Sequence, residues 1–268
     1  MKEIDIIQQF EKDFIEAGKL AQRLRKDATI SDKSTSGIKD IDVVTSSDLA
    51  VQEFLLQKLA KSELKNCELV GEEKTPSKSL FAEHSDIVLT LDPIDGTMAY
   101  ATGGKYYSVI VTLHDKKRPI YTFDYFPELD WGVKIVNDKV ELLGQRPDIS
   151  EMTVPAKVIS YATFDSKQHP KESIPELYKE YTDKGYVFMT KSEMGYGVGA
   201  TASFLLGIAD GFYYLDGSAV DCLVGMHFAL ANDYKMYRTM DISEARPSDF
   251  AGGSSEYKGY YLVLRNEK

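Results

Sequence analysis

The chain has 268 residues, 43% of them hydrophobic and 28% charged, a composition typical of a folded globular protein. The formal net charge of −10 argues against nucleic-acid polymers or anionic membranes as partners. It still permits a phosphate substrate, because bound divalent cations would reverse the local charge. The charged start lacks the order of a signal peptide, and no apolar run approaches the roughly 18 residues of a membrane span. Cys67 and Cys222 lack metal-site spacing, so we expect reduced thiols in a cytoplasmic protein.

The first 60 residues predict two helices joined by a polar loop. Residues 3–26 carry apolar side chains at three- and four-residue steps, as a core-packing helix requires. Residues 29–40 are small and polar, which predicts a loop. Ser46 or Ser47 is then expected to cap a second helix, in which the dipole alone would explain Asp48. The side chains predicted to face inward from this helix are Leu49, Phe54, Leu55 and Leu59.

Acidic residues follow two predicted strands in the first half of the chain. The strand at 67–70 runs into Glu72, and the strand at 87–91 runs into a turn that carries Asp92 and Asp95. Carboxylates at the end of a buried strand are unusual, because an unpaired buried charge is costly. Such acids normally hold a cation or face a positive partner. If the two strands lie side by side, Glu72 and Asp92 meet at neighbouring strand ends.

The rest of the chain alternates strands with helices. Residues 106–143 have the strand and turn pattern of an antiparallel meander, and residues 145–155 resemble a hinge. Later strands and helices are predicted at 157–163, 171–184, 186–190, 211–215, 220–231, 235–239 and 260–265. A glycine-rich turn at 195–199 opens a further helix with Val198, Ala202, Leu205 and Ala209 on one face, but it lacks the surroundings of a dinucleotide site. The four histidines are scattered without motif spacing, so we do not expect a catalytic histidine.

The acids form a candidate metal site. Glu72, Asp92, Asp95 and Asp221 lie at predicted strand ends or helix starts, with Asp48 and Thr97 nearby by the same logic. Carboxylates without histidine or cysteine suit Mg²⁺, Mn²⁺ or Ca²⁺. Two or three such ions, roughly 3.5–4 Å apart, activate water and stabilise the leaving alkoxide in phosphoester hydrolysis. The Ile94 carbonyl lies between the two turn acids, and Gly96 would let the backbone approach a phosphate closely.

Four segments together resemble the inositol monophosphatase family of Mg²⁺-dependent, lithium-sensitive phosphatases. Asp92-Pro-Ile-Asp-Gly-Thr97 is similar to the family signature. Asp42-Val-Val-Thr-Ser-Ser-Asp48 resembles the D-x-V-T-x-x-D segment, and Gly71-Glu72-Glu73 resembles G-E-E. Val220-Asp221-Cys-Leu-Val-Gly225 resembles W-D-x-A-A-G. The resemblance extends from about residue 3 to residue 265.

The resemblance implies an α+β fold, a layered α/β/α/β/α sandwich. An N-terminal lobe, residues 1–150, would contain an antiparallel sheet and most metal ligands, and a C-terminal lobe, residues 151–268, a mixed sheet and Asp221. The site would lie between the lobes. A homodimer is the family default.

The resemblance also implies roles for individual residues. Glu72, Asp92 and the Ile94 carbonyl would hold one Mg²⁺, and Asp92, Asp95 and Asp221 a second, with a third, weaker ion near Glu72; Mn²⁺ is a possible substitute. Glu72 and Thr97 would orient and deprotonate the attacking water, with Asp48 hydrogen-bonded to Thr97. Asp95 and the amides of Gly96, Thr97, Gly199 and Ala200 would bind phosphate or sugar hydroxyls.

The substrate side departs from the family pattern. Val220 replaces the tryptophan before the last aspartate, the substrate-binding glutamate falls on Leu215, and the E-A-G-G near residues 229–233 is missing. We therefore expect a phosphomonoesterase for a small phosphorylated polyol or sugar, such as inositol monophosphate. Two alternatives stay open. The first is a 3′(2′),5′-bisphosphate nucleotidase or fructose-1,6-bisphosphatase activity on the same metal core, and the second is a non-catalytic member that binds metal.

Overall fold

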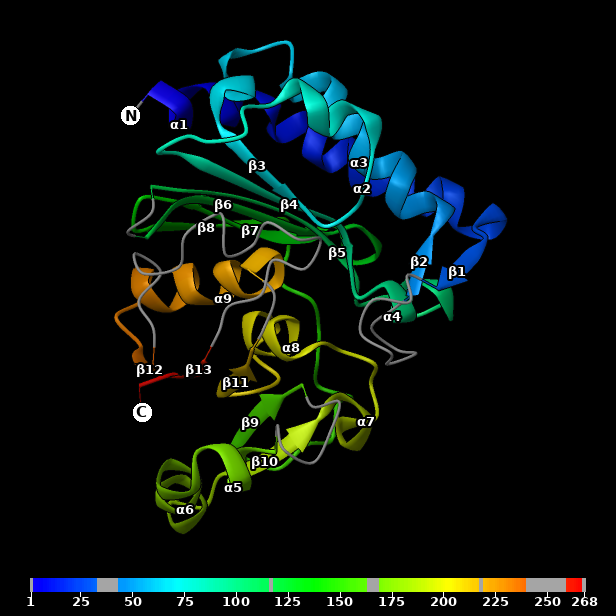
Figure 1. Cartoon of the computed structure of the whole chain (residues 1–268). Helices are drawn as coiled ribbons and strands as arrows, with labels where there is room; N and C mark the ends of the chain where they lie inside the picture. The colour runs from blue at the N-terminus through cyan, green and yellow to red at the C-terminus, as the bar shows by residue number, and fades with distance from the viewer. Residues whose placement is uncertain are drawn as a thin grey trace.

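Two β-sheets with two helices packed between them form the centre of the computed structural model (Figure 1). The structure describes residues 2–32, 43–115, 118–162, 169–216, 219–239 and 259–266. Asp42, most of the predicted loop at 29–40 and the end of the strand predicted at 157–163 lie outside these ranges. Among the described residues, none of the helices has the length and apolar character needed to span a bilayer.

The first sheet has six strands: a five-stranded antiparallel meander extended by one parallel strand. Its strands, in spatial order, are β3 (Glu68–Gly71), β4 (Val88–Asp95), β5 (Ser108–His114), β6 (Pro119–Phe126), β7 (Trp131–Val136) and β8 (Lys139–Leu143). All neighbours pair antiparallel except β3 and β4, which run parallel. The meander predicted at 106–143 is confirmed. The central strands β5 and β6 are buried along their whole length, because helices cover both faces of the sheet.

The N-terminal helices cover the outer face of this sheet (Figure 1). They are α1 (Lys2–Ile7), the short 3₁₀ turn η1 (Gln8–Phe10), α2 (Glu11–Leu24) and α3 (Ser46–Leu59). The helix predicted at 3–26 is therefore interrupted once by η1. Phe14 of α2 packs on Phe123 of β6 with ring centroids 5.2 Å apart, as expected of an apolar stripe on a core.

The second sheet is mixed, as the resemblance implied. Its spatial order is β10 (Val187–Thr190), β9 (Val158–Tyr161), β11 (Gly211–Leu215), β13 (Tyr260–Leu264) and β12 (Lys235–Arg238). The first three strands pair parallel and the last three antiparallel. Helices α8 (Ala200–Leu206) and α9 (Ala219–Ala231) lie between the two sheets, and α5 (Pro170–Ser173) and α6 (Pro175–Asp183) lie on the far side (Figure 1). The order of layers is thus α/β/α/β/α.

Several local predictions are wrong in detail. Residues 30–32 form β1 (Ile30–Asp32), which pairs with β2 (Val43–Thr45), so the predicted loop begins later. Leu49 is 40% exposed, because the buried arc of α3 centres on Val51, Leu55 and Leu59. The helix predicted at 171–184 is divided into α5 and α6. Val198 and Ala209 flank α8 rather than belonging to it.

A buried histidine fastens α9 to the first sheet. His227 lies 2.8 Å from Thr122 Oγ1 through Nδ1 and 2.6 Å from the Asn137 carbonyl through Nε2. A carbonyl only accepts, so Nε2 donates the proton and Nδ1 accepts from the threonine hydroxyl. Burial lowers the pKa of His227 to about 4, which keeps the ring neutral. The contact matters for function because α9 also carries Asp221.

We predict that His227 makes stability depend on pH. Below pH 6.5 the unfolded chain binds a proton at this ring that the folded chain does not bind until about pH 4, so stability falls as the pH is lowered. Between pH 7 and pH 5 wild type should lose about 2 kcal/mol more free energy of unfolding than His227→Gln. Urea unfolding at the two pH values measures this difference. His84→Gln, at an exposed histidine, is the control; equal losses in wild type and His227→Gln would contradict the prediction.

Candidate metal centre

The end of β4 places two aspartates on the same side of the chain. The strand does not stop at Leu91, as predicted, but continues to Asp95. Asp92 pairs with Ile110 and Asp95 with Ser108, so three steps along β4 match two steps along β5. In a regular strand, residues three apart point to opposite faces, and a bulge of one extra residue reverses this alternation. The bulge thus allows Asp92 and Asp95 to point the same way.

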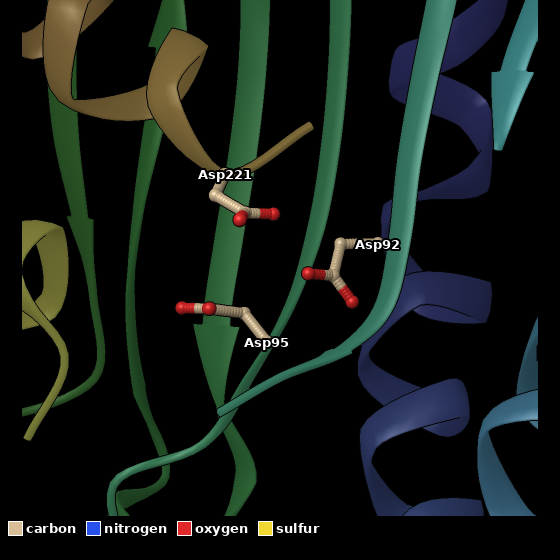
Figure 2. Close-up of side chains that lie close together, drawn as sticks. All are labelled: Asp92, Asp95 and Asp221. Atoms are coloured by element: carbon tan, nitrogen blue, oxygen red, sulfur yellow. The ribbon is translucent and has the colours of Figure 1, made fainter. Parts of the chain in front are cut away.

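Asp221 completes a cluster of three carboxylates. It lies in the first turn of α9, while the other two acids come from β4 (Figure 2). One ligand oxygen from each of Asp92, Asp95 and Asp221 lies within 4.8 Å of the others, close enough for one ion to be shared. We call this group the aspartate cluster. The all-oxygen ligand set suits Mg²⁺, Mn²⁺ or Ca²⁺, as the sequence indicated.

The aspartate cluster is electrostatically crowded. Asp92 is 2% exposed, and burial together with the charges of Glu72, Asp221 and Asp95 raises its pKa well above the usual range. Burial and Glu72 raise the pKa of Asp95 to about 6, against the opposing effects of Lys191 and of the Gly96 N–H group. Each of these shifts disfavours the ionised carboxylate. A bound cation would favour it, so the residues present fit a divalent metal.

Glu72 adjoins the aspartate cluster from the neighbouring strand. The strands β3 and β4 are parallel, with Gly71 opposite Leu91, and the Glu72 N–H donates to the Leu91 carbonyl at 3.0 Å. The predicted meeting of Glu72 and Asp92 at adjacent strand ends is therefore what the structure shows. A hydrogen bond between the two carboxyl groups adds to the raised pKa of Asp92. Glu72 is not one of the three residues whose oxygens lie within the shared 4.8 Å.

Thr97 and Asp48 lie together beside Ile94. The Thr97 hydroxyl is 3.1 Å from the Ile94 carbonyl and 3.3 Å from Asp48 Oδ1, so its single proton is shared between two acceptors. The other oxygen of Asp48 accepts from the N–H and hydroxyl groups of Thr45. Thr45, rather than Ser46 or Ser47, is therefore the cap of α3. Asp48 thus has a hydrogen-bond partner at each carboxylate oxygen. Its position is therefore explained by more than the helix dipole, which is a sufficient reason when only the sequence is considered.

The remaining predicted residues lie at two helix starts. Gly96 has φ +84 and precedes α4 (Thr97–Ala101), and a Cβ there would meet the Tyr106 carbonyl at 3.1 Å, so glycine suits this position. Gly199 precedes α8, and Ala200 is the first, buried residue of that helix. The helix α8 packs on α9. The aspartate cluster does not include Gly199 or Ala200, and their role in binding substrate stays a prediction.

Two residues near the aspartate cluster were not predicted. Lys191, the first residue of α7 (Lys191–Met194), is close enough to Asp95 for its charge to oppose the raised pKa of that carboxyl. Burial raises the pKa of Tyr214, and the charges of Asp221 and Asp95 add to this shift; the Tyr214 hydroxyl accepts from Thr201 Oγ1 at 3.4 Å. Neither residue belongs to an acidic motif. Only the fold brings them near the cluster, so spacing offered no signal for them.

Solved structures with the same overall fold cover almost the whole chain. The extragenic suppressor protein suhB from Bartonella henselae matches with a TM-score of 0.69 at 15% identity, covering 98% of this chain and 94% of that chain. An IMPase/NADP phosphatase complexed with Mg²⁺ and phosphate matches with a TM-score of 0.66 at 15% identity, covering 98% and 92%. At these identities the similarity establishes the fold: the layered α+β sandwich predicted above is confirmed.

Sequence comparison identifies the family. Inositol monophosphatase 3 of Solanum lycopersicum is 26% identical over 141 residues, which cover 53% of this chain and 52% of that protein. The chain therefore spans about half the length of this curated relative. The model of the inositol monophosphatase family matches residues 5–221, which include every residue of the aspartate cluster. The chain belongs to the inositol monophosphatase family.

Proposed function

We propose that this protein is a Mg²⁺-dependent phosphomonoesterase that hydrolyses a small phosphorylated polyol or sugar, such as inositol monophosphate. The observation that carries the proposal is the convergence of Asp92, Asp95 and Asp221 within 4.8 Å. Membership of the inositol monophosphatase family supports a phosphatase, and a relative of the same fold binds Mg²⁺ and phosphate. The particular phosphate ester is part of the proposal.

The aspartate cluster would hold the metal ions, with Glu72 and the Ile94 carbonyl as further oxygen ligands. Divalent cations at such a site supply charge neutralisation for the phosphate and the departing alkoxide, and they lower the pKa of water. The family implies two or three ions. The crowded carboxylates support more than one ion. A single divalent cation does not neutralise all of these acids, so a second cation would offset the negative charge that is left.

The chain's own contribution to proton transfer would come from Thr97, Asp48 and Glu72. Asp48 is fully buried and its Oδ2 is anchored by Thr45, so its Oδ1 presents a fixed acceptor to the Thr97 hydroxyl. A hydroxyl that donates to Asp48 can accept a hydrogen bond from an attacking water and orient it. Glu72, next to Asp92, is a second carboxylate that can take the proton. The N–H groups of Gly96 and Thr97 would bind phosphate oxygens at the start of α4.

One observation favours the alternative substrates. Lys191 adds a positive charge beside Asp95, where a second phosphate of a nucleotide bisphosphate or sugar bisphosphate could bind. Phosphate release should therefore be measured in parallel on inositol monophosphate, adenosine 3′,5′-bisphosphate, fructose 1,6-bisphosphate and histidinol phosphate. Magnesium binding without turnover of any of them would favour a non-catalytic member. The proposed homodimer and cytoplasmic location are separate predictions, and light scattering of the purified chain tests the first.

We predict that Asp92→Asn and Asp221→Asn each lower the rate of phosphate release on the order of 10²–10³-fold while the protein stays folded. Each change removes one charge from the aspartate cluster and preserves the shape of the side chain. Asp5→Asn, at an exposed position of α1, is the control and should retain full activity. Circular dichroism verifies folding. Full activity in either cluster variant would refute the metal assignment.

We also predict that activity depends on the hydroxyl group of Thr97, and that a side chain of the same shape without a hydroxyl does not substitute for it. Thr97→Val should lower kcat roughly 10²–10⁴-fold with a smaller change in KM, because the hydroxyl acts on the water rather than on the ester. Thr97→Ser keeps the hydroxyl and should restore most of kcat. Steady-state kinetics at saturating Mg²⁺ measures kcat and KM for wild type and both variants. Equal kcat values for the valine and serine variants would exclude this role.

A further inference from the structure

Three basic residues surround a small pocket far from the aspartate cluster. The pocket, of about 200 Å³, is lined by Tyr181, Lys184, Tyr186, Lys235, Leu264, Arg265 and Asn266. It lies where α6, the start of the edge strand β12 and the end of β13 meet. Because β12 begins just after α9 ends and Asp221 is at the beginning of α9, the pocket and the cluster lie at opposite ends of this helix.

The walls of the pocket are held in place by packing. Tyr181 is 3% exposed and Tyr186 is 6% exposed, and their rings meet edge to face with centroids 5.4 Å apart. The Lys184 ammonium lies 4.8 Å from the centroid of the Tyr181 ring. The Arg265 guanidinium lies 4.6 Å from the centroid of Phe204. The positive groups therefore lie against aromatic surfaces, which restricts their positions.

Three cations line the pocket, and two of them interact with the carboxylate of Glu180. Within the described part of the chain, neither Lys235 nor Arg265 forms an ion pair with a carboxylate. Lys184 pairs with Glu180 at 2.6 Å, and Lys157 donates to the Lys184 carbonyl at 3.2 Å. Three cations therefore line this pocket, in a protein with a formal net charge of −10. An anion would find a locally positive site there.

The pocket also has more donors than acceptors. The Lys235 ammonium donates to the hydroxyls of Tyr181 and Tyr237, which are themselves 3.0 Å apart. This uses two of its three N–H groups. Arg265 donates to the Tyr234 hydroxyl at 3.1 Å and to the Phe204 carbonyl, which uses two of five. The remaining N–H groups have no acceptor among the described residues, so a ligand rich in acceptors would satisfy them.

We propose that this pocket is a second anion site, which binds a phosphate-type oxyanion without a metal. Its volume of about 200 Å³ is below the roughly 300–1,000 Å³ of sites for drug-sized ligands, so it fits a phosphate group rather than a whole nucleotide. The site differs in chemistry from the aspartate cluster, where phosphate would need cations to offset the carboxylates. The proposal does not depend on the phosphatase activity.

A titration with inorganic phosphate in EDTA tests the proposal. Without divalent cations the aspartate cluster repels phosphate, so binding reports the second site. ¹H–¹⁵N spectra of the full chain, at ionic strength matched with NaCl, should show saturable shifts at the Tyr186 amide and the Asn266 side chain, with Kd on the order of 1 mM. A parallel titration with glycerol 3-phosphate compares a phosphate ester with free phosphate. Saturable binding of either supports the site, and the tighter binder shows which of the two ligands the site prefers.

Two matched variants test whether the anion binds in this pocket. Lys235→Gln removes one charge at the first residue of the edge strand β12 and should weaken binding about tenfold. Lys139→Gln makes the same change at the exposed first residue of the edge strand β8 and should leave Kd unchanged. The proposal is wrong if neither anion causes saturable shifts at Tyr186 and Asn266. It is also wrong if Lys235→Gln binds as tightly as wild type.

Discussion

Three carboxylates from two separate elements, one buried and two partly buried, share one small space, and the surrounding structure must hold them there against their repulsion. At a separation near 4.8 Å, each pair of ionised groups costs roughly 3 kcal/mol at an effective dielectric constant of 20. Glu72 adds a fourth acid next to Asp92. The fold must hold these groups together against that cost. Divalent cations are the ligands that would turn the same arrangement into a favourable one.

The aspartate cluster is held in place from two sides. On one side, β4 lies inside a six-stranded sheet, and its bulge turns Asp92 and Asp95 the same way. On the other side, α9 is enclosed between two sheets, and His227 ties it to Thr122 and to the β7–β8 turn. Asp221 therefore reaches the cluster from a helix that packing and hydrogen bonds keep in place. The layered architecture provides this rigidity, because a helix between two sheets has apolar contacts on opposite faces.

Much of the site could be predicted because its signals are local. The run of acids after two apolar strands identified Glu72, Asp92 and Asp95, and the structure then showed that the two strands, β3 and β4, pair side by side. Asp221 is different: its first-turn position has an ordinary explanation, and it joined the candidate metal site only as one more acid at a predicted helix start. The bulge was missed because Pro93 and Gly96 read as a turn, whereas the strand continues through that proline. The Thr45 cap was missed because two serines follow it.

Residues brought together only by tertiary structure could not be predicted. Lys191 and Tyr214 approach the acids from α7 and β11, and Lys184, Lys235 and Arg265 meet from a helix end and two strands. None of them belongs to a spaced motif. Leu49 shows the opposite error, since its apolar character predicted burial but its place on α3 lies outside the buried arc.

The most direct test of the crowded cluster is the free energy of unfolding of wild type and Asp92→Asn at pH 7.5, in EDTA and in Mg²⁺. Asparagine can still accept the Ile94 N–H bond that Asp92 accepts at 2.9 Å, so the variant removes charge and little else. We predict that Asp92→Asn is the more stable protein in EDTA. Mg²⁺ at 100 times its Kd should stabilise wild type by about 3 kcal/mol and the variant far less. Equal stabilisation of both proteins, or none of wild type, would contradict a metal centre at these aspartates.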